Sequence, residues 1–509
     1  MSSTFTHPAL APFDAHNQQL AANVHPAVWL NPQPRDRYDL VVIGAGTAGL
    51  VTAAGAAGLG AKVALIEREL MGGDCLNVGC VPSKALIRAA KACAQARAAI
   101  EFGVSIGNSW VPDFSIAMER LRRLRAGISH HDSAARFKNI GVDVFIGEGW
   151  FKSKTAIEVD GKQLSFSHAV IATGARAVDL PIPGLREAGY LTNENVFSLT
   201  SLPKSLAVIG AGPIGCELAQ AFARFGSKVV VLEQGKKFLP REDRDAAAIV
   251  QHAMRSDGVE FNTDAKIQSV NLIGNQKQLH LKTSTSPQTL TVDHILIGVG
   301  RAPNVGGINL EAAGVTYDTR SGVHVDDHLR TSNRRIFAAG DICFPYKFTH
   351  AADAMARIVI QNALFFGRKK ASALLIPWCT YTQPEVAHVG LYASEAQAKG
   401  LSFDTIKIDM AEIDRAILDS DTQGFLKIHY EKKTGKILGA TLVAAHAGDI
   451  ISEVTVAMAA SMSLGKLAAV IHPYPTQAEV IKRAADAFNR TRLTRRAKSF
   501  LGMLIRLNR

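Results

Sequence analysis

The chain has 509 residues, 47% of them hydrophobic and 20% charged, which suits two to four packed domains and excludes an intrinsically disordered protein. The net charge of +12 suggests a nucleic-acid-binding protein, but residues 482–509 alone hold nine Lys and Arg and one acid. The excess charge therefore belongs to a tail, and we expect no nucleic-acid partner. Six cysteines are too few for a secreted disulfide scaffold of this size, and the first residues lack a secretory pattern, so we expect a cytoplasmic protein.

After a lead-in of 37 residues, the sequence predicts a dinucleotide-binding unit. The apolar run from Tyr38 to Ile43 is typical of a parallel strand buried on both faces. Gly44, Gly46 and Gly49 follow at the spacing G-x-G-x-x-G, before an Ala-rich helix and a second strand that ends at Glu67. The glycines allow a tight turn and the approach of a pyrophosphate, and Glu67 is placed to bind ribose hydroxyls.

Two cysteines come soon after this unit, in the stretch GGDCLNVGCVPSK at residues 72–84. Cys75 and Cys80 are five positions apart, so on a helix they meet only if the backbone is distorted, and Gly79 permits that distortion. Lys84 places a cation near Cys80 and lowers the pKa of a thiol there. The spacing is compatible with a reversible disulfide, and equally with two buried structural thiols.

The glycine pattern repeats in the middle of the chain. A strand from Leu206 leads into Gly210, Gly212 and Gly215, then a helix and a second strand that ends at Glu233. Two such units imply two dinucleotides, or electron transfer between them. Glu233 favours NADH because it stands where a ribose 2′-hydroxyl binds, whereas three nearby cations leave NADPH open, namely Lys236, Lys237 and Arg241.

Taken together, the motifs GAGTAG, GGDCLNVGCVPSK, ATG, GAGPIGCE, GVGRAPN, AAGD and YPTQAE occur in order between residue 38 and about residue 488. In these motifs the chain resembles the flavin-dependent pyridine nucleotide–disulfide oxidoreductases, the family of dihydrolipoamide dehydrogenase, glutathione reductase and mercuric reductase. The resemblance implies an α/β fold with two Rossmann-like domains, for FAD and NAD(P)H, and a C-terminal α+β domain that forms a homodimer. The expected boundaries are lead-in 1–37, FAD domain 38–175 and 298–370, NAD(P) domain 176–297, dimerisation domain 371–488 and basic tail 489–509.

The resemblance also assigns cofactor-binding residues. The FAD and the NADH or NADPH are expected at Gly44, Gly46, Gly49, Glu67, Gly73, Thr173, Gly174, Gly210, Gly212, Gly215, Glu233, Gly300, Arg301, Gly340 and Asp341. Asp341 is expected to bind the ribityl chain of the flavin. We expect no resident metal, because the other four cysteines lack partners at metal-ligand spacing, and we expect all four to be buried small side chains, namely Cys93, Cys216, Cys343 and Cys379.

The same resemblance implies that Cys75 and Cys80 form the redox-active disulfide. Cys80 is expected on the flavin side, and Cys75 is expected to pass electrons to the acceptor. Lys84 is expected to lie by the flavin and to pair with Glu217, because a buried lysine without a carboxylate loses its charge.

The chain departs from the disulfide-reducing members near its C-terminus. Those enzymes have His-Pro-Thr with a glutamate five residues after the histidine, whereas this chain has Tyr474, with Glu479 five residues later and His472 two positions early. The tyrosine is similar to that of mercuric reductases, which predicts a soft metal ion as acceptor. Their vicinal C-terminal cysteines and N-terminal metal-carrier motif are absent. A disulfide reductase, in which His472 serves as the acid, a redox-sensing flavoprotein and a quinone-reducing diaphorase remain alternatives.

The tail has the pattern of an amphipathic helix. Apolar residues recur three and four positions apart, with arginines and a lysine between them, at Leu493, Ala497, Phe500, Leu504 and Leu507. Such a helix can lie on an anionic membrane surface, or its apolar stripe can pack on the parent dimer.

Overall fold

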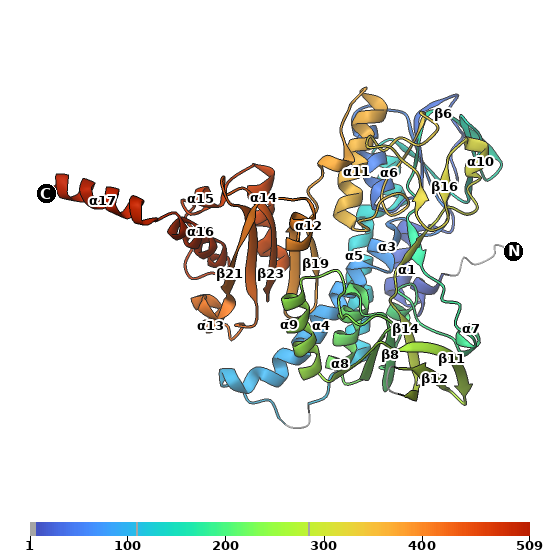
Figure 1. Ribbon diagram of the computed structural model, residues 1–509. Coiled ribbons are helices and arrows are strands. Elements are labelled where there is room, and N and C mark those ends of the chain that lie inside the picture. The colour runs from blue at the N-terminus through green and yellow to red at the C-terminus, as the bar shows by residue number, and fades with distance from the viewer. Residues whose placement is uncertain (1–6, 108–109, 284–285) are drawn as a thin grey trace. The chain divides into compact units, whose positions relative to one another are not determined.

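The computed structural model describes residues 7–107, 110–283 and 286–509. The chain forms two compact units (Figure 1): unit 1 comprises Met1–Lys236 and Glu260–Leu374, and unit 2 comprises Lys237–Val259 and Leu375–Arg509. Sheets and helices occur in both units, so the mixed α/β architecture predicted from the sequence is confirmed.

The larger sheet of unit 1 has a parallel core built from the predicted apolar runs. It runs in the order β3 (Val142–Ile146), β2 (Val63–Glu67), β1 (Tyr38–Ile43) and β6 (Lys162–Ile171), with β18 (Ile336–Ala338) parallel on the other side of β6. The strands β5 (Ala156–Val159) and β4 (Gly149–Ser153) extend β6 as an antiparallel meander. Five of the six residues of β1 are buried, as expected for a strand covered on both faces.

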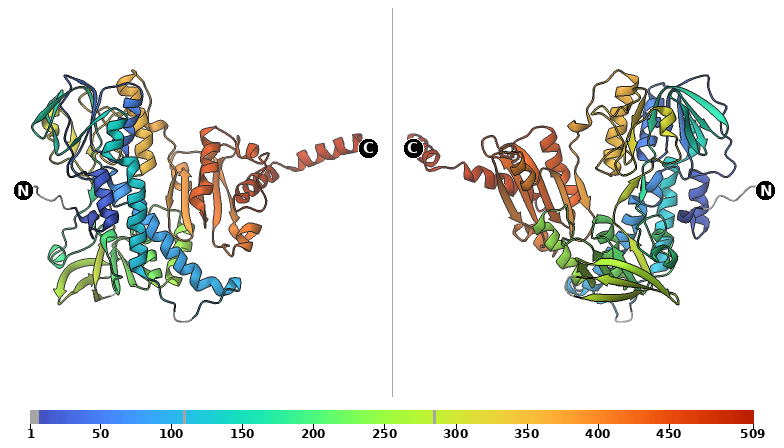
Figure 2. Two further views of the ribbon diagram at one scale, coloured as in Figure 1. Left: turned by 180° about the vertical axis from the view of Figure 1, so that it is seen from behind. Right: turned by 45° about the vertical axis from the view of Figure 1, so that its right-hand side comes forward.

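Two helices that are far apart in the sequence cover this sheet together (Figure 2). α2 (Thr47–Gly58) packs against α11 (Thr349–Leu364), and the approach is so close that a Cβ at Gly55 would lie 2.6 Å from Cδ1 of Ile360. The start of α11 is thereby fixed beside the first glycine turn.

The second sheet of unit 1 repeats the same plan at the predicted position. It has the order β10 (Val259–Thr263), β9 (Lys228–Glu233), β8 (Ser205–Ile209) and β14 (His294–Ile297), with β9, β8 and β14 parallel, and α8 (Pro213–Phe225) follows the glycine turn. The three strands β11 (Lys266–Ile273), β12 (Gln276–Lys282) and β13 (Pro287–Val292) form an antiparallel sheet. The short strands β7 (Ala175–Ala177) and β15 (Arg301–Pro303) pair where the chain crosses between the two Rossmann-like regions.

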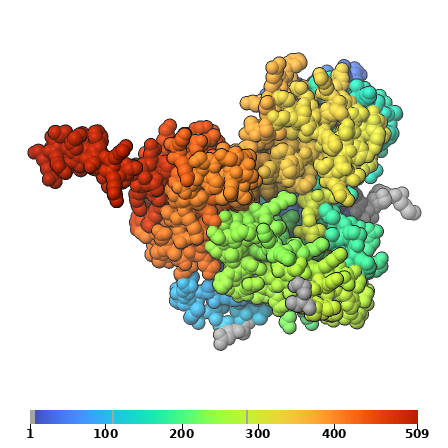
Figure 3. All heavy atoms as spheres, in the orientation of Figure 1, coloured from blue at the N-terminus to red at the C-terminus, as the bar shows by residue number. Residues whose placement is uncertain are grey.

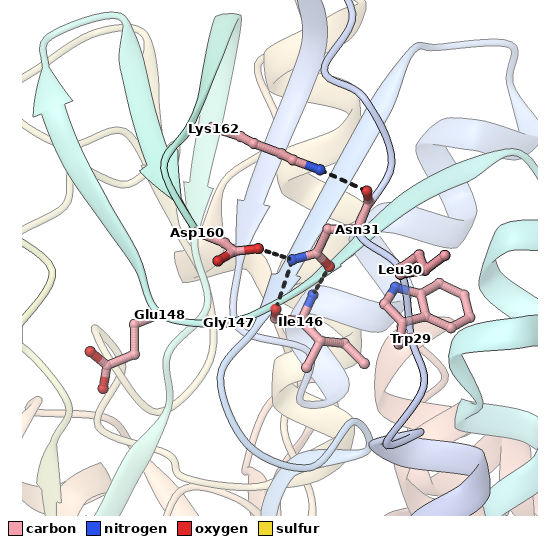
Figure 4. Close-up of a pocket in the computed structure, with 8 residues that line it drawn as sticks. All are labelled: Trp29, Leu30, Asn31, Ile146, Gly147, Glu148, Asp160 and Lys162. Atoms are coloured by element: carbon pink, nitrogen blue, oxygen red, sulfur yellow. Dashed lines mark hydrogen bonds between the residues drawn. The ribbon is translucent and has the colours of Figure 1, made fainter. Parts of the chain in front are cut away.

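The described part of the lead-in is packed on unit 1. It contains η1 (Pro8–Leu10) and α1 (Ala15–Val24), whose Leu20 and Val24 are fully buried. Further along, the side chain of Asn31 donates to the carbonyl oxygen of Ile146 at 2.9 Å and accepts from the N–H of Ile146 at 2.8 Å, at the end of the edge strand β3. Lys162 donates to the backbone carbonyl oxygen of Asn31 at 2.8 Å (Figure 4). A shallow groove of about 490 Å³ lies along this contact, and no cysteine lines it. A lead-in without sustained periodicity is expected either to pack on the surface or to stay mobile, and its described part is packed.

The helix α5 (Phe114–Ile128) corrects one expectation. Leucines and arginines are interleaved in the sequence at residues 121–125, a pattern that predicts a solvated basic face, but Arg125 is fully buried and Arg122 is 7% exposed. Arg122 pairs with Asp14 of the lead-in at 2.6 Å. The lead-in packs on α5 and buries a basic helix face that would otherwise be exposed to solvent.

Unit 2 is built on one antiparallel sheet. Its order is β19 (Trp378–Thr380), β20 (Glu385–Gly390), β23 (Ile437–Ala444), β22 (Phe425–Glu431) and β21 (Phe403–Asp409). The helices of this unit include α9 (Arg244–Ser256), α13 (Asp414–Leu418), α14 (Ala447–Ala459), α16 (Glu479–Thr491) and α17 (Arg495–Leu507). Among the described residues, no helix of either unit is both long and apolar enough to cross a bilayer.

Candidate active site

The two cysteines lie at a break between two helices, as their spacing predicted. Cys75 is in α3 (Gly73–Asn77), and Cys80 is the first residue of α4 (Cys80–Ala98). Gly79 forms the break, and a Cβ there would lie 2.7 Å from the carbonyl oxygen of Asp74. Only glycine lets the backbone fold this tightly. Both cysteines have free thiols in this structure, and Cys75 is half-buried whereas Cys80 is exposed.

Three groups favour a thiolate on Cys80. The Cys75 thiol donates a hydrogen bond to the Cys80 sulfur, which is the main reason that the pKa of Cys80 lies well below its usual range. The Thr349 hydroxyl lies 3.5 Å from the same sulfur, and the charge of Lys84 adds to the effect. Cys80 also begins α4, where backbone N–H groups favour negative charge.

Cys75 has the opposite character. Its hydrogen bond to Cys80, its burial and the nearby carboxylate of Asp132 all raise the pKa of the Cys75 thiol. In the two-electron-reduced pair the proton therefore stays on Cys75 and the negative charge on Cys80.

The predicted pairing of Lys84 with Glu217 is confirmed as a contact. Nζ of Lys84 lies 2.9 Å from Oε2 of Glu217, whose side chain is 6% exposed in α8. The ion pair keeps Lys84 charged beside Cys80, and it ties the cysteine helix to the second glycine motif.

The buried Arg125, which the sequence placed on a solvated helix face, holds the loop between the cysteines through hydrogen bonds. Arg125 donates to the carbonyl oxygen of Asn77 at 2.6 Å, and its other nitrogen donates to Ala9 and Asn17 of the lead-in, at 2.7 Å each. Asn77 in turn donates to the carbonyl oxygens of Met71 and Gly73, at 3.0 and 2.9 Å. Burial lowers the pKa of Arg125 to about 10, so the group stays charged at neutral pH.

The glycine turns fit dinucleotides on geometric grounds. At Gly44 and Gly49, a Cβ would lie 2.4 Å from Ala172 O and 1.8 Å from Gly44 O, so the fold itself demands these two glycines. At Gly46, by contrast, the nearest atom to an added Cβ is 3.8 Å away, on Gly73. The protein leaves space at the middle glycine, and a bound pyrophosphate explains why no side chain fills it.

The second turn repeats this arrangement. An added Cβ would lie 2.2 Å from Gly210 O at Gly215 and 2.8 Å from Gly298 O at Gly210, whereas at Gly212 the nearest atom is 3.9 Å away. Here too the middle glycine is free of protein contacts.

The predicted ribose-binding acids adopt matching geometry in the two turns. Glu67 accepts hydrogen bonds from the backbone N–H of Ala45 at 2.7 Å and of Glu69 at 2.9 Å. Glu233 accepts from Ala211 at 2.9 Å and from Gly235 at 2.7 Å. Each carboxylate is therefore fixed at the mouth of its turn, where the ribose of a bound dinucleotide lies.

The remaining predicted cofactor residues cluster at the carboxyl ends of the unit 1 strands. Arg301 bonds to Asp74, next to Cys75, and its Nε lies 3.4 Å from Oδ2 of Asp341. Burial raises the pKa of Asp341. The other members are held by local contacts: Thr173 and Gly174 bond to the backbone of Asn304, and Gly300 and Gly340 have φ values of 129° and 84°.

The predicted C-terminal residues lie in unit 2 and form one charged cluster there. The exposed Tyr474 donates from its hydroxyl to Asp414 at 2.8 Å. Arg483 links Asp414, at 3.7 Å, to Glu479, at 3.0 Å. The hydrogen bond to Asp414 raises the pKa of Tyr474, so the phenol holds its proton at neutral pH. The sequence analysis missed Asp414 and Arg483.

His472 lies outside this cluster. Its Nε2 is 2.7 Å from Oε1 of Glu453, and its Nδ1 is 3.2 Å from the carbonyl oxygen of Val470. Since Glu479 pairs with Arg483, unit 2 contains no His472–Glu479 dyad.

The chain also matches two family models and several characterised proteins. Residues 38–356 match the model described as pyridine nucleotide-disulphide oxidoreductase, and residues 376–485 match the dimerisation domain of the same family. Mercuric reductase of Bacillus cereus is 33% identical over 479 residues, 94% of this chain and 76% of that protein. Dihydrolipoyl dehydrogenase of Bacillus subtilis is 34% identical over 457 residues, 88% of this chain and 96% of that protein.

Among solved structures, the Cu(II) complex of the HOCl-induced flavoprotein disulfide reductase RclA from Escherichia coli is similar with a TM-score of 0.79 and 30% identity. The match covers 87% of this chain and 98% of RclA. LpdA from Mycobacterium tuberculosis has a TM-score of 0.80 at 27% identity.

Proposed function

Because the chain belongs to the pyridine nucleotide–disulfide oxidoreductase family, a group of FAD- and NAD(P)H-dependent enzymes that form homodimers, we propose that its acceptor is a soft metal ion. FAD, which the first glycine turn and Asp341 would hold, would link NAD(P)H to the Cys75–Cys80 disulfide, and the reduced cysteine pair passes its electrons to a thiol-reactive metal such as Hg(II) or Cu(II). The bound FAD supplies the step that links a hydride donor to a disulfide.

The observation that carries this proposal is the state of the C-terminal cluster. A disulfide acceptor releases a thiolate that has to be protonated, which a histidine paired with a carboxylate does well near neutral pH. Among the described residues, two groups stand at the corresponding positions. The phenol of Tyr474 keeps its proton and donates a hydrogen bond to Asp414, and His472 is hydrogen-bonded to Glu453. A metal held between sulfurs needs no such acid, because soft ions bind thiolates and leave as the reduced metal.

The reduced cysteine pair carries one proton, which is the number that this reaction needs. Reduction of the disulfide by two electrons with one proton, all from one NAD(P)H, gives a Cys75 thiol and a Cys80 thiolate. These are the protonation states that the opposite pKa shifts favour. Transfer of two electrons to Hg(II), or of one to each of two Cu(II), restores the disulfide and releases the Cys75 proton.

In this mechanism each residue has a defined task. Cys75 attacks and binds the metal, Cys80 shares it as the second sulfur ligand, and Lys84 with Glu217 keeps positive charge beside the Cys80 thiolate. Tyr474 and Glu479 are proposed to act at the metal site of the partner subunit, as the resemblance to mercuric reductases implies. NADH is the favoured donor because Glu233 is held at the ribose position.

The alternative is a disulfide reductase of the dihydrolipoyl dehydrogenase type, which the relatives support at similar identity. A redox-sensing flavoprotein with low turnover is a third candidate. The lowered pKa of Cys80 is compatible with all three candidate functions, so the candidates differ in the electron acceptor alone.

One assay separates the candidates. Steady-state oxidation of NADH and of NADPH is measured with Hg(II) and Cu(II) as complexes of a small thiol, lipoamide, oxidised glutathione and a quinone. We expect metal-dependent turnover that the Cys75→Ser variant loses. Faster turnover with lipoamide or oxidised glutathione contradicts the proposal, and a single reduction without turnover supports the sensor. Quinone reduction that survives Cys75→Ser supports a diaphorase.

We also propose the cytoplasm as the location, because a reversible dithiol of this kind suits a reducing compartment. Fractionation of cells that express the tagged protein tests this location.

A further inference from the structure

The C-terminal helix α17 (Arg495–Leu507) has no cover within its own unit. None of its residues is buried, although Thr494 caps the helix by accepting a hydrogen bond from Ala497 N at 3.2 Å. It is the red end of the chain in Figure 3, and Figure 1 shows it beyond α16 in unit 2. Six large apolar side chains are 44–76% exposed, namely Phe500, Leu501, Met503, Leu504, Ile505 and Leu507.

These apolar side chains share one face of the helix. At about 100° per residue they fall in an arc of about 200°, with Leu504 near its centre. Arg495, Lys498 and Arg506 fall in the opposite arc, while Arg496 lies at the rim of the apolar face, where a long side chain can extend to water. The apolar and the basic faces are therefore segregated.

The charge of this segment has one sign. After Asp486 the chain contains no Asp or Glu, and seven cations follow, namely Arg490, Arg492, Arg495, Arg496, Lys498, Arg506 and Arg509. Acid-free basic charge beside a broad apolar face is complementary to a bilayer surface, which offers anionic headgroups and acyl chains at the same depth.

We propose that α17 is a peripheral membrane anchor that binds anionic phospholipid surfaces and lies in the plane of the interface. Its 13 residues span about 20 Å, too short to cross a hydrocarbon core of about 30 Å. The homodimer presents two such helices, so the second binding event is intramolecular and strengthens the attachment. The anchor goes beyond the proposed reaction and does not depend on the acceptor.

The alternative covering surface is a second copy of this chain. The basic face argues against this alternative. Packing on a second copy would bury the apolar arc, but the segment contains no acid that could pair with its seven cations. This alternative is nevertheless distinguishable by measurement.

Co-sedimentation of the full-length holoenzyme with vesicles tests the proposal. Vesicles of phosphatidylcholine with about 30% phosphatidylserine are compared with pure phosphatidylcholine, at low and high salt. We expect binding to the anionic vesicles that weakens as salt rises. The triple variant Arg495→Glu, Lys498→Glu, Arg506→Glu should bind at least about 100-fold more weakly, since each lost cation accounts for about fivefold.

Two further variants keep the test sharp. The variant Lys432→Glu, Lys433→Glu, Lys436→Glu makes the same charge change at exposed positions of unit 2 and should bind as wild type does. Phe500→Glu with Leu504→Glu keeps every cation and should also lose binding. All variants should retain NADH-dependent flavin reduction, which shows that they are folded.

Three outcomes overturn the proposal. Equal binding by wild type and the α17 triple variant excludes a role for the basic face. Equal sedimentation with neutral and anionic vesicles excludes charge recognition. An absence of vesicle binding, together with a weaker homodimer after deletion of 490–509, assigns the apolar face to the second copy of the chain.

Discussion

The cysteine site of unit 1 and the Tyr474 cluster of unit 2 are built on opposite principles. Around Cys80 in unit 1, a thiol, a hydroxyl and a lysine all favour negative charge on sulfur. Around Tyr474 in unit 2, Asp414 favours retention of the phenolic proton, and Arg483 neutralises the acids. The first site is prepared to hold a thiolate, whereas the second holds a phenol whose pKa is raised by its hydrogen bond to Asp414.

This contrast teaches where the specificity of the enzyme resides. The cysteine site is assembled within one unit, and its chemistry suits any acceptor that a dithiol can reduce. In the proposed function the acceptor depends on the C-terminal cluster, which has a phenol and an ion pair where disulfide-reducing members have an acid–base pair.

The largest expected effect comes from the cysteines. Cys75→Ser and Cys80→Ser should each lower acceptor-dependent NAD(P)H oxidation by at least about 10³-fold, because a covalent step cannot be bypassed. Reduction of the bound FAD by NADH, followed by rapid-mixing absorbance, should continue in both variants. If acceptor turnover survives in either variant, electrons reach the acceptor directly from the cofactor. The difference between the two sites then does not explain the choice of acceptor.

The next effect is at the C-terminal cluster. Tyr474→His places a titratable acid five residues before Glu479 and should raise lipoamide or oxidised-glutathione turnover by about 10²-fold. Metal-dependent turnover should fall or stay level in the same variant. Tyr474→Phe, which removes only the hydroxyl, is the matched control and should gain no disulfide reductase activity. An unchanged substrate preference in Tyr474→His shows that this cluster does not select the acceptor.

A smaller effect is expected at Lys84. Lys84→Met removes the cation that lies 2.9 Å from the buried carboxylate of Glu217 and should slow flavin reduction by about tenfold, with little change in the affinity for NADH. It should also destabilise the fold by about 1–3 kcal/mol, measured by urea unfolding. Lys84→Arg keeps the charge and should recover most of both. Wild-type reduction rates in Lys84→Met remove the residue from this role.

The smallest effect concerns the Cys80 thiolate itself. In the NADH-reduced enzyme, alkylation of Cys80 by iodoacetamide should stay fast below pH 7, because its pKa lies below that of a free thiol. Thr349→Val removes one hydrogen-bond donor and should shift the pH profile upward, whereas Thr349→Ser should not. Coincident profiles for the valine variant and wild type exclude Thr349 as a source of the low pKa.

The sequence predicted the parts of the molecule that depend on local patterns. The two glycine turns, the helix break at Gly79 and the Lys84–Glu217 contact were all accessible, because motifs of fixed spacing encode them. The family, the cofactors and the α/β class followed from the same motifs.

What it did not predict depends on distant contacts. Thr349 reaches Cys80 across 269 positions in the sequence, and nothing near it marks the hydroxyl as a thiol partner. Arg122 and Arg125 were expected to be exposed because a basic helix face normally contacts solvent. The lead-in that buries them has no sequence pattern that predicts its packing. Similarly, Cys343 and Cys379 are half-buried and not fully buried as expected.

The most direct test of the central claim is the fate of the reduced enzyme. Enzyme reduced with one equivalent of NADH is mixed rapidly and without oxygen with either a Hg(II) thiol complex or lipoamide, and reoxidation is followed by flavin and thiol content. Reoxidation by the metal at least about tenfold faster than by lipoamide, lost in Cys75→Ser, is the result that the Tyr474 cluster predicts. Faster reoxidation by lipoamide would show that the enzyme is a disulfide reductase despite lacking the histidine.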